Sequence, residues 1–360
     1  MMLGNRIRQA RLAAGLTLQA LGETVGVSHT AIQKFEKDLL TPSSSQLLEL
    51  AKSCSVRVEY FFRTHKVVLL NPEFRKQSIF GKTAQESLKI KVLELVEKRV
   101  ELLSLFPESP IPNFGVPPGL PKYIQSLEDI EELANKIRDK WKLGLDPIGD
   151  LTDTLESLGL LVIVVDENHH GFSGLTATAK TSDGYIYPVI AVSSKWPGDR
   201  QRFTLAHEIG HILLSGRLDT LLDEEKACDR FAGAFLAPKA TVLNNLGQNR
   251  RCLEWQELYS LKHEFGLSMG GWLQRAKQCG VISDMAHLTH WKAFSAKGWR
   301  KVEPGDPLER EHPRSFEQLV YRALGEQFIS ETKAAELLGI PMMRFFKERQ
   351  LEAVVAVTHQ

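Results

Sequence analysis

Two histidines four residues apart, in the stretch FTLAHEIGHILL, constrain this chain more than any other feature of its sequence. In a helix, His207 and His211 lie one turn apart on the same face. Two neutral imidazoles at that spacing can bind one tetrahedral zinc ion, and Glu208 is then placed to take a proton from a zinc-bound water. The alternative is an amphipathic helix with two solvated histidines, but the neighbouring residues are very apolar for a surface helix.

The composition indicates a globular protein with more than one domain. Its 360 residues are 43% hydrophobic and 25% charged, which suits two or three cores, and the net charge of +1 excludes no class of partner. No leader-like or membrane-spanning apolar run occurs, so we expect a cytoplasmic protein. The cysteines form no C-x-x-C pair, which fits a reducing compartment and predicts no thiolate zinc site: Cys54, Cys228, Cys252 and Cys279.

Residues 1–66 predict a helical domain with a basic surface. They hold nine Lys or Arg and five Asp or Glu, a net charge of +4 that suits nucleic acid but is a weak indication alone. Thr17 and Ser28 are expected N-caps on either side of a turn at Gly26, which is the plan of a helix-turn-helix. Five short helices are expected, at 7–14, 17–25, 28–37, 46–53 and 59–63.

The rest of the chain predicts a multidomain α+β protein with three further parts. We interpret residues 67–125 as a linker that contains one long helix, over 88–105, and the proline-rich stretch ESPIPNFGVPPGLP. Residues 126–245 are expected to form an α+β domain, and residues 246–360 a mostly helical region without an internal repeat.

The α+β domain should place its strands before the histidine helix. Uninterrupted or alternating apolar runs predict strands at 160–165, 171–180 and 185–192. A second helix, over 223–236, should follow the histidine helix and end before Pro238.

Three patterns in the first 62 residues are IRQAR-x-x-x-GLT, GVSHTAIQKFEK, and TP followed by LLELA. Together they resemble the Xre-type helix-turn-helix of phage repressors. The resemblance implies a homodimer that binds operator DNA, with Leu21, Val27, Ile32, Phe35, Leu47 and Leu50 as the core of each head. The third helix, opened by Ser28, would present the contact residues to base edges and phosphates: His29, Thr30, Gln33 and Lys34. Leu18 departs from the pattern, because such repressors often carry a polar residue there.

Residues 126–340 resemble a second family. The stretches RQRFTLAHEIGHILL and EKACDRFAGAFLAP, with GFSGL and PVIAV before them and KAAELL in the tail, are similar to those of the ImmA/IrrE metallopeptidases. The resemblance implies a zinc-dependent endopeptidase-like domain, and the substrates of that family are often helix-turn-helix repressors.

A catalytic zinc site needs a third protein ligand besides two histidines. The resemblance places a glutamate ligand at Glu225, and Asp229, one turn further, is a candidate acceptor for a histidine N–H. Glu224 remains an alternative ligand, because the charges at 223–226 are crowded.

Substrate binding is less well determined than the metal site. The donor that stabilises the oxyanion is left open among His169, His170 and Tyr187. An exposed strand edge beside the histidine helix could bind the substrate backbone by strand addition.

The leading hypothesis is a DNA-binding transcriptional regulator that also cleaves a repressor or antitoxin-like protein, with Zn²⁺ as cofactor and Glu208 as general base. The main alternative is a non-catalytic regulator, such as the antitoxin of a toxin–antitoxin pair, whose peptidase-like domain senses a signal or binds a partner. A third reading is autocleavage within the proline-rich stretch.

Overall fold

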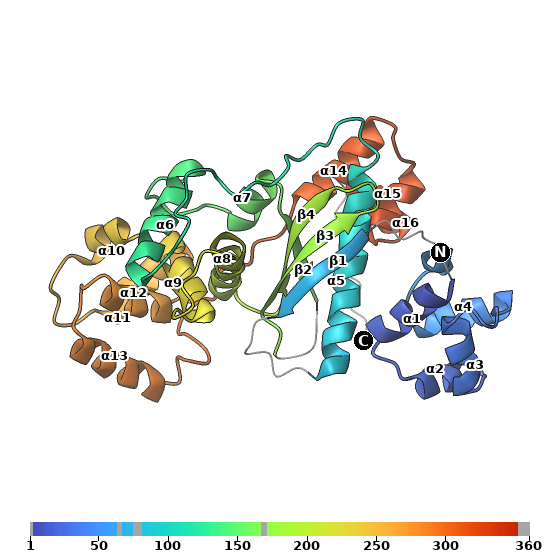
Figure 1. Cartoon of the computed structure of the whole chain (residues 1–360), viewed down its shortest axis with the longest axis horizontal. Helices are drawn as coiled ribbons and strands as arrows, with labels where there is room; N and C mark the ends of the chain where they lie inside the picture. The colour runs from blue at the N-terminus through green and yellow to red at the C-terminus, as the bar shows by residue number, and fades with distance from the viewer. Residues whose placement is uncertain (1–2, 63–66, 75–80, 167–170, 352–360) are drawn as a thin grey trace.

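The computed structural model describes residues 3–62, 67–74, 81–166 and 171–351, and it has the expected multidomain α+β architecture (Figure 1). A four-stranded sheet lies between a small helical head at the N-terminus and a larger group of helices. Among the described residues, no helix combines the length and the hydropathy needed to cross a membrane.

The head follows the helix-turn-helix plan. Thr17 and Ser28 each accept a hydrogen bond from the backbone N–H three residues on, and Gly26 turns the chain with a φ of 75°. Five of the six expected core residues are buried, and Val27 is partly buried against them. The elements are α1 (Leu3–Ala13), α2 (Leu18–Val25), α3 (His29–Glu36), α4 (Ser44–Ser53) and the 3-10 helix η1 (Val58–Phe62).

The segment expected to be a linker contributes to the fold. Within it, β1 (Val67–Phe74) is a strand that pairs with the sheet, and α5 (Lys82–Leu103) packs across one sheet face. We did not expect β1, because Asn71 and Pro72 interrupt its apolar run and the register shifts beside them. The proline-rich stretch has no regular structure, yet it is anchored: a Cβ on Gly159 would lie 2.1 Å from the Pro112 carbonyl oxygen.

The sheet has the strand order β1-β3-β4-β2, with β2 parallel to β4 and the other pairs antiparallel. The expected strands are present as β2 (Leu161–Val165), β3 (Gly174–Thr181) and β4 (Ile186–Ser193). One face packs on α5 and the other on α8 (Gly198–Leu214), the histidine helix. Strands covered on both faces are apolar throughout, as β2 and β4 are.

Helices on the α8 side of the sheet form the largest hydrophobic core, and α9 (Glu224–Leu236) packs along α8 within it. Helices α11 (Trp255–Phe265) and α12 (Met269–Gln278) form a packed pair, in which Trp272 and Arg275 are fully buried. The remaining helices are α6 (Leu127–Lys140), α7 (Leu151–Ser157), α10 (Lys239–Leu246) and α13 (Asp284–Ala296).

The C-terminal helices repeat the element lengths of the head, although no repeat was expected from the sequence. Helices α14 (Ser315–Gly325), α15 (Glu331–Leu338) and α16 (Met342–Arg349) have 11, 8 and 8 residues, like α1, α2 and α3. Gly339, with a φ of 71°, makes the turn that Gly26 makes in the head. The similarity lies in the helix lengths and the turn, because the residues on the exposed faces differ.

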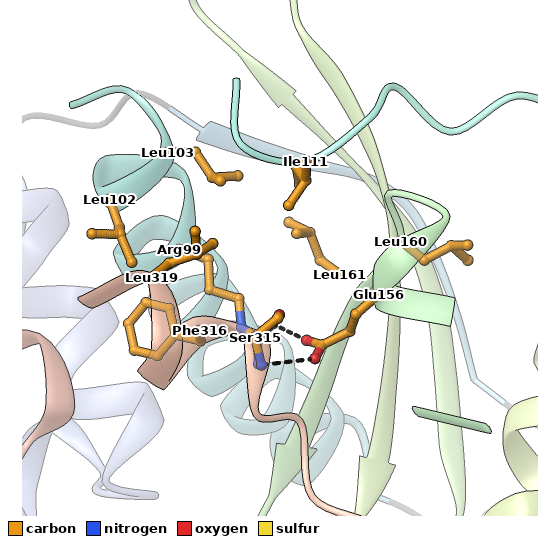
Figure 2. A pocket seen from close by; sticks show the side chains of 10 residues that line it. All are labelled: Arg99, Leu102, Leu103, Ile111, Glu156, Leu160, Leu161, Ser315, Phe316 and Leu319. Atoms are coloured by element: carbon orange, nitrogen blue, oxygen red, sulfur yellow. Dashed lines mark hydrogen bonds and ion pairs between the residues drawn. The ribbon is translucent and has the colours of Figure 1, made fainter. Parts of the chain in front are cut away.

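A buried ion pair between α5 and α7 also contacts the start of α14 (Figure 2). The Arg99 guanidinium on α5 donates to the Glu156 carboxylate at the end of α7, at 2.6 Å. The other oxygen of Glu156 accepts from the backbone N–H of Ser315 at 3.3 Å, at the start of α14. The pocket that Arg99, Glu156 and Ser315 help to line leaves only about 10 Å³ of space, so it is a packing contact.

Candidate metal centre and DNA interface

The two histidines occupy the buried middle of α8, where α9 crosses it. His207 is fully buried and His211 partly so. The crossing is close because Gly210 has no side chain: a Cβ there would lie 3.2 Å from the Cα of Cys228 on α9. A larger residue at position 210 would therefore push the two helices apart.

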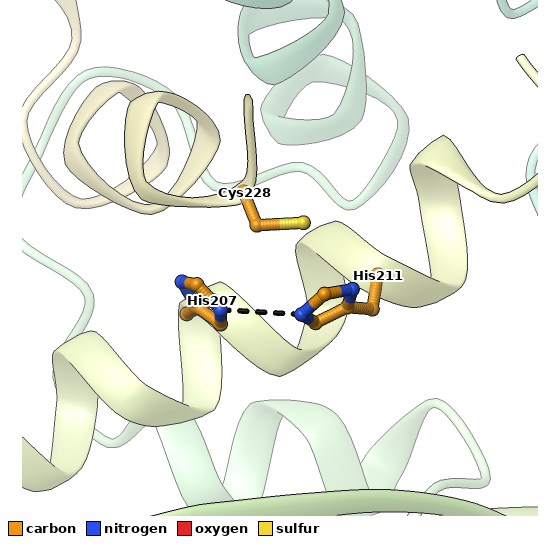
Figure 3. A group of neighbouring side chains, drawn as sticks. All are labelled: His207, His211 and Cys228. Carbon is orange, nitrogen blue, oxygen red and sulfur yellow. Dashed lines mark hydrogen bonds between the residues drawn. The ribbon is translucent and has the colours of Figure 1, made fainter. Parts of the chain in front are cut away.

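The inner nitrogens of the two histidines face each other, and Figure 3 shows the Cys228 side chain beside them. The Nε2 atoms of His207 and His211 are 3.2 Å apart. The carboxylate of Glu225 lies 3.5 Å from the first of these nitrogens and 3.8 Å from the second. Two nitrogens bound to one tetrahedral zinc at 2.0–2.1 Å would be separated by about 3.3 Å, so the donor set fits that ion.

The outer nitrogens of both rings also contact carboxylates. Nδ1 of His207 is 2.8 Å from Asp229, and Nδ1 of His211 is 3.0 Å from Glu224. An N–H at each Nδ1 that donates to its carboxylate leaves the lone pair of Nε2 pointing inward, as a metal ligand requires. Glu224, the alternative ligand, thus lies at the outer side of His211, whereas Glu225 faces both inner nitrogens.

Cys228 also lies close to the histidines, and its sulfur is within 4.8 Å of their ring nitrogens. Burial, followed by the charges of Glu224 and Glu225, raises the pKa of this thiol. The side chain fills the contact between α8 and α9 opposite Gly210. Its position makes it a second candidate for the third ligand, which sequence reasoning had excluded for all cysteines.

Glu208 is buried under the sheet and contacts β3. Its carboxylate accepts a hydrogen bond from the Thr176 hydroxyl at 2.5 Å. A Cβ on Gly174 would lie 2.6 Å from the other carboxylate oxygen, so only glycine leaves room for the acid at that position. No local pattern indicated Thr176 or Gly174, because their role depends on how the sheet packs on α8.

The structure does not bring Tyr187 to the histidines. Its side chain packs in the cluster between the sheet and α5, on the face opposite α8. Burial raises the pKa of its phenol, as for other core tyrosines. His169 and His170, the other candidates for the oxyanion donor, lie outside the described residues.

On the head, α3 presents the expected contact residues to solvent. His29, Thr30, Gln33 and Lys34 are exposed, as is Ser28 at the N-cap. Leu18 instead packs partly against the head's core, which explains why a polar residue is absent there.

Fewer basic side chains are available at the surface of the head than its sequence suggests. Arg6 is buried in an ion pair with Glu97 of α5 at 2.8 Å, and Arg11 is buried in one with Glu36 at 2.5 Å. These two cations therefore serve the fold and not a nucleic-acid surface.

Two family models match the chain. The helix-turn-helix model covers residues 7–61, and the model of the IrrE N-terminal-like domain covers residues 156–277. The second match contains β2 to β4, α8 and α9, which are the elements that form the candidate metal centre.

Curated relatives match the same two parts separately. The chain is 40% identical over 60 residues to an uncharacterized transcriptional regulator in the ATPase CF(0) region of Rhodospirillum rubrum, covering 17% of this chain and 56% of the relative. It is 32% identical over 123 residues to the radiation response metalloprotease IrrE of Deinococcus deserti, covering 32% of this chain and 43% of that protein.

A third relative is the uncharacterized regulator y4aM of Sinorhizobium fredii, 28% identical over 127 residues, covering 35% of this chain and 83% of y4aM. The chain spans about half the length of the first curated relatives it matches. The matches nevertheless agree with the elements described above. The chain therefore joins an Xre-type helix-turn-helix domain at its N-terminus to an IrrE N-terminal-like domain.

Proposed function

We propose that the protein is a cytoplasmic, dimeric regulator that binds operator DNA through its head and cleaves a repressor or antitoxin-like protein with zinc. The observation that carries the peptidase assignment is the convergence of two histidine Nε2 atoms and the Glu225 carboxylate on one point, beside Glu208. A structural zinc site would have no use for an acid in that position.

Each residue of the candidate metal centre would have a separate role in the reaction. His207, His211 and Glu225 would hold the metal, and Asp229 keeps the His207 ring oriented through Nδ1. When bound, zinc would supply a Lewis acid that makes water acidic enough to lose a proton near neutral pH. Glu208 would accept that proton and later return it to the amine that leaves the cleaved peptide bond. Thr176 orients the acid for this transfer through its hydroxyl.

Metal analysis of four variants tests the ligand set. We expect about one zinc per chain in the wild type, and loss of zinc in His207→Ala and Glu225→Gln. Glu224→Gln and Cys228→Ser change the two rival candidates on α9, and both should keep about one zinc per chain if Glu225 is the ligand. Loss of zinc in Cys228→Ser with retention in Glu225→Gln would assign the third ligand to the thiol instead.

Cleavage is tested with an Xre-type repressor encoded beside this gene, incubated with the zinc-loaded protein. We expect fragments that disappear with Glu208→Gln and with a chelator. A protein that binds zinc stoichiometrically but cuts no such repressor would favour the alternative of a non-catalytic regulator or antitoxin.

A further inference from the structure

The strand edge beside the histidine helix is covered by the chain itself. Without β1, the sheet would be β3-β4-β2, and β3 would be an edge strand with free backbone N–H and C=O groups. Instead β1 pairs antiparallel with β3 over most of its length, from Val67 opposite Thr181 to Phe74 opposite Leu175. The exposed edge that the sequence led us to expect there is therefore occupied.

The covered edge belongs to the strand that contacts the proposed general base. Gly174 and Thr176 of β3 are the residues against which the Glu208 carboxylate rests. The last paired residues of β1, Glu73 and Phe74, lie opposite Thr176 and Leu175. An extended peptide that added to β3 in place of β1 would thus run past the catalytic carboxylate.

We propose that this edge of β3 is the binding site for an extended segment of the substrate protein, and that β1 is an internal occupant of the site which must leave before a substrate can bind. This proposal rests on the proposed function only in calling the bound segment a substrate. The binding edge itself does not depend on that function. An edge strand recognises any extended chain through its backbone, and β1 already shows the antiparallel pairing that a substrate would take.

Few side chains hold β1 on the core. Val67 is its one fully buried side chain among the described residues, and Leu69 is partly buried beside it. Val68 and Leu70 are 59% and 39% exposed. Pro72 has no N–H to donate, and the register shifts between Leu70 and Glu73, so the pairing is interrupted in the middle.

The position of β1 connects the binding edge to the head. The strand begins five residues after the last element of the head ends at Phe62. Helix α1 faces it across a groove of about 310 Å³, which Asn5 and Gln9 line together with Val67, Val68 and Leu69. The head therefore lies beside the strand that covers the β3 edge.

A pair of neighbouring substitutions tests whether β1 covers a binding site. Val67→Asp places a charge in the core between the sheet and α5 and should release the strand, because an unpaired buried carboxylate is strongly unfavourable. Val68→Asp adds the same charge one residue on, at an exposed position, and is the control. The probe is a fluorescent synthetic peptide with the sequence of residues 67–74, followed by anisotropy.

We expect this peptide to bind Val67→Asp at least about tenfold more tightly than it binds the wild type or Val68→Asp. In the latter two proteins β1 covers the β3 edge, which lowers the fraction of molecules able to bind the peptide. Equal binding to all three proteins, or no binding to a folded Val67→Asp, would overturn the proposal.

A reversible crosslink gives a second test that does not depend on the folding of Val67→Asp. Val68 and Lys180 are direct cross-strand partners, so the double variant Val68→Cys, Lys180→Cys can lock β1 on β3 by oxidation. The control, Lys180→Cys with Ile186→Cys, joins β3 to its permanent neighbour β4 through the same residue. With zinc-loaded protein and unstructured casein as substrate, oxidation should abolish cleavage in the first variant only, and reduction by a phosphine should restore it.

The two tests separate the two proposals. An oxidised lock variant that cleaves casein as fast as its reduced form would show that β1 need not leave. If no form of the protein cleaves casein or a repressor, while the peptide binds Val67→Asp selectively, the peptidase assignment fails and the binding edge stands.

Discussion

At the scale of residues, the candidate metal centre depends on which nitrogen of each imidazole faces inward. The carboxylates of Asp229 and Glu224 contact the Nδ1 atoms, which leaves both Nε2 atoms on the inner side. The spacing of the histidines predicted that they would converge, because i and i+4 are neighbours on any helix. It could not predict the contact of Glu208 with Thr176, since 32 residues separate them along the chain and only the packing of the sheet on α8 joins them.

The proposed general base, Glu208, should be separable from the proposed metal ligands by one substitution. Glu208→Gln keeps the size and a hydrogen-bonding group opposite Thr176 but cannot accept a proton. We expect unchanged zinc content and a loss of cleavage rate of about 10²–10⁴-fold, the usual contribution of acid–base catalysis. Zinc analysis and single-turnover cleavage of the repressor measure the two effects. Cleavage at the wild-type rate would remove Glu208 from the mechanism.

The carboxylate behind His207 should affect metal affinity more than stability. Asp229→Asn weakens the acceptor at Nδ1, and we expect zinc affinity to fall about 10–100-fold. Competition with a zinc-binding dye measures this change. Asp139→Asn, at an exposed position on α6, is the control and should have wild-type affinity. An Asp229→Asn variant with the same affinity as this control would show that the contact does not support the site.

At the scale of elements, the helices of the head were predictable because their ends are encoded locally. Thr17, Ser28 and Gly26 act through their own backbone neighbours, so the sequence alone places α2 and α3. Strand β1 shows the opposite case. Its sequence, VVLLNPEF, has a broken pattern, and it becomes a strand only because β3 offers an edge to pair with.

The exposed face of α3 predicts how the head reads DNA. Gln33→Ala should cost about 1–3 kcal/mol at one base position and relax specificity there, because it removes a side chain suited to base edges. Lys34→Ala, if Lys34 meets phosphate, should weaken binding to all sequences alike and lower the salt slope by about one. Mobility shifts on the gene's own upstream region at several salt concentrations measure both.

The control for α3 is Lys136→Ala, which removes an exposed cation on α6, away from the head. Since Arg6 and Arg11 are held in buried ion pairs, the salt slope of the wild type should reflect fewer contacts than the charge count of the head suggests. Unaltered affinity and specificity in a Gln33→Ala, Lys34→Ala double variant would place the DNA elsewhere.

At the scale of the whole molecule, the parts are joined more tightly than the sequence suggested. A linker was expected after residue 66, because proline-rich and charged stretches usually mark boundaries. Instead β1 and α5 complete the sheet, and α14 packs against α5 from the C-terminal side. The sequence could not indicate this, because contacts between distant segments leave no local pattern.

The buried pair of Arg6 and Glu97 joins the head to α5, and it should dominate the stability of that joint. Both side chains are largely buried, so Glu97→Gln leaves a guanidinium without its carboxylate, at a cost of about 3–5 kcal/mol. Glu348→Gln, which breaks the more exposed pair with Arg344, is the control and should cost about 0–1 kcal/mol. Urea unfolding gives the free energies, and limited proteolysis shows whether the head is released near residue 66.

A double variant distinguishes a lost ion pair from lost packing at this joint. Arg6→Met with Glu97→Leu removes both charges and keeps most of the volume, so it should recover much of the stability that Glu97→Gln loses. If β1 is held in place by the docked head, Glu97→Gln should also bind the 67–74 peptide more tightly than the double variant does. Equal stability of Glu97→Gln and Glu348→Gln would mean that the head is docked by its apolar contacts alone.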